Sequence, residues 1–88
     1  MKILIESTTA AVSRKLHISS DQFVSIAHDG LAGAEEITFE IDLAGTFTAV
    51  APKVALTAGT NYIQIAGPNT YNVVKPTTAS PVAVFVNA

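Results

Sequence analysis

The sequence predicts an all-β fold, a small antiparallel β-sandwich or barrel of about seven to nine short strands with no substantial helix. Residues 35–43, EEITFEIDL, alternate polar and apolar side chains without a break, which is the period of a strand with one face in the core. Clusters of Gly, Pro, Asn, Asp and Ser recur about every ten residues and predict turns at the spacing of a sandwich or barrel. The length of 88 residues allows one domain, spanning residues 1–88.

The first third of the chain contains three expected strands. Residues 2–6 (KILIE), 15–19 (KLHIS) and 23–28 (FVSIAH) are rich in β-branched and other apolar side chains, and the turn clusters SSDQ and HDGLAG follow the second and the third. Residues 7–16 are the one candidate for a helix, but their threonine, valine and serine residues weaken helix propensity. We therefore expect a loop between strands there.

The middle of the chain holds the alternating strand and two shorter ones. The pair Asp29–Gly30 comes before it and favours a tight turn with positive φ at the glycine. In residues 35–43 we expect the four apolar side chains to enter the core and the polar ones to meet water. Residues 46–50 (TFTAV) and 53–57 (KVALT) follow as strands between the clusters LAGT and AGTN.

Three more strands are expected in the last third, at residues 62–67 (YIQIAG), 70–75 (TYNVVK) and 81–86 (PVAVFV). The clusters GPNT and KPTTASP separate them. Proline is tolerated at the first position of a strand, where its missing N–H costs no ladder bond. Pro81 is therefore expected to open the last strand.

The last strand departs from the polar and apolar alternation of the others. By the strand period, Val82, Val84 and Val86 point one way while Ala83 and Phe85 point the other. Apolar side chains on both faces predict either burial on both faces or an outer face that meets another chain.

The composition is rich in apolar and poor in charged residues. Hydrophobic residues make up 49% and charged residues 14% of the chain, against roughly 25% charged in typical soluble domains. Such a weakly charged small protein often covers part of its surface in an assembly. With five Lys and Arg residues and a formal net charge of -2, the chain lacks the basic footprint of a nucleic-acid-binding protein. No cysteine is present for disulfides or thiolate metal sites.

The sequence also indicates a chain made and kept soluble in a cytoplasm, with no membrane partner. The apolar stretch in MKILIEST is too short for a signal peptide. No run approaches the roughly 20 apolar residues that span a bilayer.

Residues able to carry chemistry are scattered rather than grouped. His17 and His28 have no second ligand at metal-binding spacing and are interpreted as a strand-face residue and a residue beside a turn. Glu36, Glu40 and Asp42 share one strand face, at about 6–7 Å per two-residue step, as on a solvated face. We expect no catalytic, metal-binding or cofactor-binding residue, no cofactor and no enzymatic activity.

The two tyrosines are the remaining candidates for ligand contact. Tyr62 and Tyr71 could stack on a sugar or a base, but their positions near turns favour filling the rim of a sandwich.

The C-terminal third, LTAGTNYIQIAGPNTYNVVKPTTASPVAVFVN, together with HDGLAGAEEITFEI, resembles the small capsid decoration (cement) proteins of tailed bacteriophages. The likeness is carried by Gly67, Pro68, Tyr71, Val73, Lys75, Pro76, Pro81 and Val82. It covers about half of the chain and is a pattern of turns and valines rather than a catalytic motif. The resemblance implies many copies bound to an icosahedral shell, which they stabilise against the pressure of packaged DNA.

These observations lead to the expectation of a virion structural protein on the capsid surface. It would bind the major capsid protein in many copies, through sheet edges and apolar side chains, and form homo-oligomers on the virion. The alternative is a tail-associated or fibre-associated β-sandwich that binds carbohydrate or another virion protein. The residues expected at the core or at the protein interface are Ile3, Ile5, Val82, Val84, Phe85 and Val86.

Overall fold

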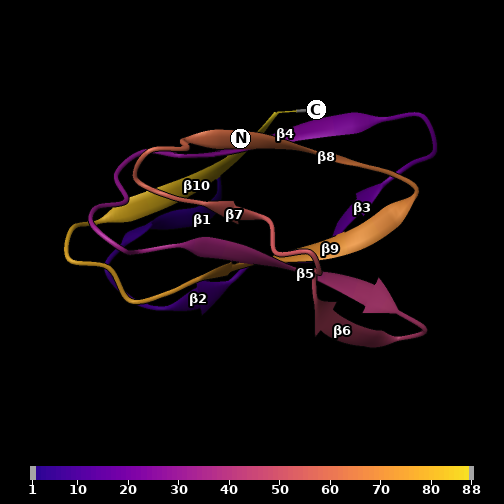
Figure 1. Ribbon diagram of the computed structural model, residues 1–88, viewed down its shortest axis with the longest axis horizontal. Coiled ribbons are helices and arrows are strands. Elements are labelled where there is room, and N and C mark those ends of the chain that lie inside the picture. The colour runs from indigo at the N-terminus through magenta and orange to yellow at the C-terminus, as the bar shows by residue number, and fades with distance from the viewer. Residues whose placement is uncertain (1, 88) are drawn as a thin grey trace.

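The computed structural model describes residues 2–87 and confirms the all-β prediction. Ten strands form two antiparallel sheets, and no helix occurs in the described residues (Figure 1). The strands are β1 (Lys2–Ser7), β2 (Ala11–Val12), β3 (Leu16–Ile18), β4 (Phe23–His28), β5 (Ile37–Leu43), β6 (Thr46–Ala49), β7 (Ala55–Leu56), β8 (Tyr62–Ala66), β9 (Asn69–Lys75) and β10 (Val82–Asn87).

The first sheet, sheet A, has four strands in the order β1-β10-β4-β8. The pairing of Leu4 with Val84, and of Val84 with His28, places these three side chains in one row on the inner face. All three are buried. Because neighbouring rows on a pleated sheet alternate between its faces, the inner rows also define which residues point outward.

The second sheet, sheet B, is built around the long pair β9 and β5. Each of its edges is a broken strand: β2 and β3 both pair with β9, and β6 and β7 both pair with β5. Ser13 bridges the first break, since its N–H donates to the carbonyl of Val73 (2.9 Å) and its hydroxyl oxygen accepts the N–H of Val73 (2.9 Å). The side chain therefore replaces a ladder bond that the irregular backbone lost.

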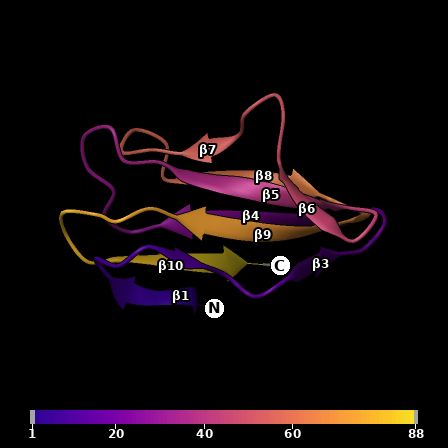
Figure 2. The same cartoon turned by 90° about the horizontal axis from the view of Figure 1, so that it is seen from below.

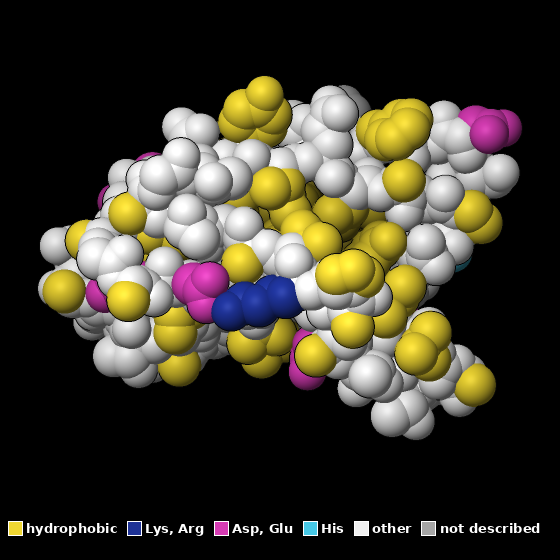
Figure 3. All heavy atoms as spheres, viewed as in Figure 1, with side chains coloured by type: hydrophobic (Ala, Val, Ile, Leu, Met, Phe, Trp, Pro, Cys, Tyr) yellow, Lys and Arg dark blue, Asp and Glu magenta, His cyan; other side chains and the backbone are white. Residues whose placement is uncertain are grey.

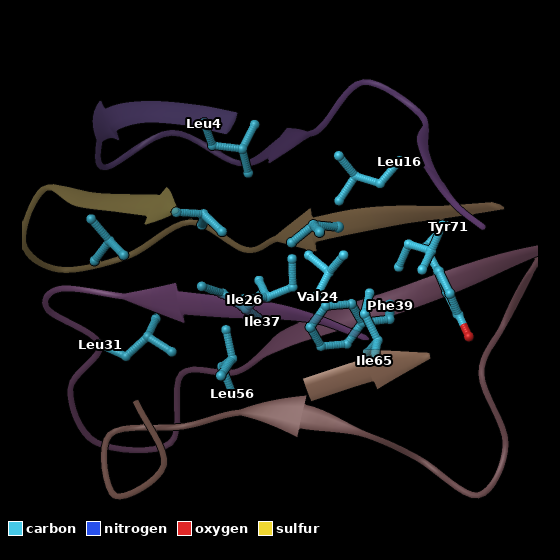
Figure 4. Packing of buried hydrophobic residues seen from close by; sticks show 14 residues of the cluster. Leu4, Leu16, Val24, Ile26, Leu31, Ile37, Phe39, Leu56, Ile65 and Tyr71 are labelled. Atoms are coloured by element: carbon cyan, nitrogen blue, oxygen red, sulfur yellow. The ribbon is translucent and has the colours of Figure 1, made fainter. Parts of the chain in front are cut away.

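The two sheets stack face to face, and their inner faces form one core (Figures 2 and 4). Its buried members are Leu4, Leu16, Ile18, Val24, Ile26, Leu31, Ile37, Phe39, Leu56, Ile65, Tyr71, Val73, Val82 and Val84.

Strand β5 follows the expected alternation over only part of its length. Ile37 and Phe39 are buried, whereas Ile41 is half-buried and Leu43 is 54% exposed. The end of β5 and its partner β6 form a hairpin that projects beyond the sandwich (Figure 1), so Leu43 has no opposing sheet to cover it.

Two local expectations are corrected by the structure. Residues 7–16 are not entirely a loop, because Ala11–Val12 forms strand β2, which pairs with β9 and was not among the nine expected strands. Gly30 does not have positive φ; the glycines with positive φ are Gly33 and Gly45. A tight hairpin turn is not required at Gly30, because the chain crosses there from sheet A to sheet B instead of returning beside β4.

The C-terminal strand shows why its sequence is apolar on both faces. Strand β10 lies between β1 and β4, and Val82, Ala83 and Val84 are each 0% exposed. Burial on both faces, one of the two expected alternatives, therefore holds for the first half of the strand. Phe85 and Val86 in the second half are half-buried.

Candidate protein-docking surface

The residues expected at the core or interface separate into three groups. Val82 and Val84 are fully buried and so are core residues, not available to another chain. Ile3, Phe85 and Val86 are half-buried. Ile5 is 79% exposed, because its neighbour Leu4 points into the core and successive side chains of a strand point to opposite faces.

The outer face of sheet A carries a row of residues that crosses all four strands. Lys2 pairs with Phe85, Phe85 with Ala27, and Ala27 with Tyr62. The Lys2 ammonium nitrogen lies 6.0 Å from the centre of the Phe85 ring, in the range of a cation–π contact. The row is apolar except at its Lys2 end.

Exposed apolar side chains at one end of this row and beyond it extend the row into a surface. Phe23 stands at the start of β4, in phase with Ala27, and is 67% exposed, while Tyr62 is 61% exposed. Apolar side chains stand out over β4 and β8 in the space-filling view (Figure 3). We call Ile5, Phe23, Ala27, Tyr62 and Phe85 the apolar platform.

The two outer faces of the sandwich differ in chemistry. The strands of sheet A carry only two charged Lys, Asp or Glu residues, Lys2 and Glu6, and both lie on the edge strand β1. The outer face of sheet B carries Glu40 and Asp42, in register with Asn72 and Phe47 respectively. The polar face of sheet B is an ordinary solvated surface. The platform gathers exposed apolar side chains on one face, of the kind that mark interaction sites, although the polar row of Asn87, Ser25 and Gln64 separates Phe23 from the rest.

A hollow with an apolar floor lies beside β8 on the side of sheet B (Figure 3). Ile41, Val50 and Ile63 are partly buried hydrophobic residues packed against the core. Strand β7 covers the sandwich near Leu56, but it spans two residues, so the rest of this side stays open.

Glu36, one of the three carboxylates expected on a solvated strand face, and its neighbour Glu35 make separate contacts. Lys53 forms an ion pair with Glu36, with 2.5 Å between its Nζ and the carboxylate. Glu35 instead accepts the N–H of Ala32 (3.0 Å) and of Ala79 (2.7 Å). These two backbone donors, that of Ala32 first, hold the pKa of Glu35 below its ordinary value, and Lys75 adds to the effect. Both groups therefore have structural partners.

The histidines also have structural surroundings. His17 is exposed and hydrogen-bonds Thr70 (2.9 Å) on the neighbouring strand. His28 is 9% exposed and contacts the carbonyl oxygen of Thr57. In residues 2–87 no group of three or more His, Asp or Glu side chains is close enough to hold a metal ion.

The tyrosines occupy opposite environments. Tyr71 is 8% exposed and its hydroxyl donates to the carbonyl of Ala66 (3.1 Å), so it is a core residue rather than a rim residue. Tyr62 is exposed on the platform. The sequence contained a signal for the platform in FVSIAH, since burying Val24 and Ile26 in a strand forces Phe23 and Ala27 outward.

Comparisons with protein-family models, with curated proteins and with solved structures found no match. Within the described part of the chain, no helix is long and apolar enough to cross a membrane.

Proposed function

We propose that this chain is a virion structural protein that decorates or cements the capsid surface of a tailed bacteriophage. In this proposal many copies bind the major capsid protein, and the apolar platform is the surface that meets the shell. The identity of the partner rests on the sequence resemblance to decoration proteins. The platform is the single structural observation that supports docking.

The physical basis of docking is burial of the platform. Ile5, Phe23 and Tyr62 are each more than half exposed, and apolar burial contributes about 25 cal/mol per Å² before the costs of association are subtracted. Aromatic side chains are enriched among the residues that dominate binding energy at interfaces. When many copies bind one shell together, the strengths of their individual contacts sum through multivalency.

The test is co-sedimentation of the purified protein with expanded capsids that lack it. Stoichiometric binding is expected for the parent chain, and the double variant Ile5→Ser, Phe23→Ser is expected to bind at least about tenfold more weakly. Val12→Ser is the matched control, because Val12 is 58% exposed but belongs to sheet B. A folded parent chain that stays in the supernatant, or a double variant that binds like the parent, would contradict the proposal.

A second candidate function is a tail-associated or fibre-associated module that binds carbohydrate. The exposed aromatic side chains of Tyr62 and Phe23 on one sheet face favour it, since such rings stack on sugars. Tyr71 is buried and cannot serve in this way. Saturable binding on a glycan array that Tyr62→Ala abolishes would support this function, as would a neighbouring tail fibre gene, whereas a neighbouring major capsid gene would favour decoration.

A further inference from the structure

Strand β8 is an edge strand of sheet A whose outward groups can be identified. Among the strands of residues 2–87 it pairs with β4 and no other. The N–H of His28 donates to the carbonyl of Asn61 (3.0 Å), and the N–H of Gly67 donates to the carbonyl of Gln22 (3.1 Å). Odd-numbered residues of this segment therefore face β4.

The even-numbered residues of β8 must then present their backbone groups to the free edge, because hydrogen-bonding direction alternates along an antiparallel strand. These residues are Tyr62, Gln64 and Ala66. The carbonyl of Ala66 accepts the hydroxyl of Tyr71 (3.1 Å) and the side-chain amide of Asn69 (3.4 Å), which confirms that it points away from β4, so this end of the edge already has partners. Tyr62 and Gln64 present their N–H and C=O groups beside the hollow described above.

This edge lacks the features that protect the opposite edge of the same sheet. Strand β1 pairs with β10 through two register irregularities and carries Lys2 and Glu6. Such bulges and charges discourage pairing with another chain. Strand β8, YIQIA, holds one constant register with β4 and has no charge and no proline.

Among the edge strands of sheet B, β2, β3 and β7 span only two or three residues, and the uncharged strand β6 is a poorer template than β8. It lies on the projecting hairpin, and Thr46, Thr48 and Ala49 are exposed. Three of its four residues therefore offer little apolar area beside the backbone, whereas in β8 Ile65 belongs to the core and Ile63 packs against it.

We propose that two copies of this chain pair through β8, antiparallel, about a two-fold axis at Gln64. The sequence of β8 is nearly symmetric about this residue, with Ile63 before it and Ile65 after it. Antiparallel self-pairing sets Gln64 against Gln64 and Ile63 against Ile65 of the second copy, and Tyr62 against Ala66. A two-fold interface requires such self-complementarity, and an uncharged strand meets it without like-charge repulsion.

The paired chains would share one sheet of eight strands, four from each copy. The half-buried Ile63 of one copy would lie next to the apolar hollow beside β8 of the other (Figure 3). The two apolar platforms would also lie on the same outer face of the shared sheet, because both belong to the outer face of sheet A. This part of the inference rests on the proposed function: the dimer would be the homo-oligomer that docks on the capsid.

The dimer is tested by sedimentation velocity on the purified protein up to about 1 mM. A reversible monomer–dimer equilibrium is expected, with amide hydrogen exchange at Gln64 slowing as concentration rises. Gln64→Lys and Gln64→Glu should each weaken association at least about tenfold, because like charges would meet at the axis. An equimolar mixture of the two variants should restore it. Thr48→Lys, an exposed position on β6, is the matched control and should associate like the parent chain.

Gln64→Pro provides an independent variant. Its missing N–H belongs to the free edge and not to the ladder with β4, so the monomer is expected to keep its fold while association is lost. A parent chain that remains monomeric at the highest concentration would overturn the dimer, as would Gln64→Lys associating like the parent. No capsid takes part in these measurements, so their failure would leave the proposed docking to be judged by co-sedimentation.

Discussion

The Nε2 nitrogen of His28 lies 2.6 Å from the carbonyl oxygen of Thr57. This hydrogen bond joins the end of β4, in sheet A, to the residue that follows β7, in sheet B. A carbonyl can only accept, so Nε2 carries the proton, and Nδ1 is then free to accept the N–H groups of Gly30 and Leu31 (3.2 Å each). One imidazole thus holds the two sheets together and shapes the crossing between them.

Replacement of His28 by Ala should therefore destabilise the fold. The change leaves the N–H of Leu31, a buried residue, without its acceptor and removes one of two donors to the carbonyl of Thr57, which still accepts the N–H of Thr60 (3.2 Å). The expected loss in free energy of unfolding is about 3 kcal/mol, measured by urea denaturation. His17→Ala, at an exposed position, should change it by less than about 1 kcal/mol, and equal effects at the two histidines would argue against the role given to His28.

Gly67 should not tolerate a side chain. A Cβ atom there would clash with the backbone carbonyl oxygens of Ser19 and Ile18. Gly67→Ala is expected to cost roughly 3 kcal/mol, at the upper end for overpacking, in thermal or urea unfolding. Gly59→Ala, where nothing lies within 4 Å of the added atom, should stay within about 0.5 kcal/mol of the parent. A stable Gly67→Ala variant would show that the contact between these two turns is wrong.

The carboxylate of Glu35 should make stability depend on acid pH. Its pKa is lowered in the folded protein, first by the N–H of Ala32 and then by that of Ala79. The ionised form therefore stabilises the fold above the ordinary pKa of Glu, near 4.3, and this stabilisation is lost as the pH falls through the lower, folded value. Glu35→Gln should lower the melting temperature at pH 7, and the gap to the parent chain should shrink toward pH 3. A gap that does not change with pH would contradict the assignment.

Val84 and Ile5 should respond oppositely to truncation, although both were expected at the core or interface. Val84→Ala removes two buried methyl groups at a 0% exposed site and should cost about 2 kcal/mol. Ile5→Ala, at a 79% exposed site, should stay within about 0.5 kcal/mol. Urea denaturation of both variants checks the division between core and platform, and a costly Ile5→Ala would mean that Ile5 packs inside.

The sequence predicted the strands well because their signals are local. All nine expected segments contain a strand of the structure, and Ile37 and Phe39 enter the core as their alternation required. The two-residue strand β2 was missed because its pairing depends on β9, more than sixty residues later. The surplus of apolar residues indicated a contact surface, but Phe23 and Ala27 were not recognised as part of it.

The sequence by itself determined the all-β class, most strand positions and the apolar character of both faces of the last strand. Alternation and turn residues act between near neighbours in the chain, so they can be identified without knowing the fold. Only the tertiary structure decided that Val82 and Val84 are core and Ile5 surface, that Tyr71 is buried and Tyr62 exposed, and which backbone groups of β8 face outward. Each of these depends on which strands become neighbours, and that follows from packing two sheets together over the whole chain.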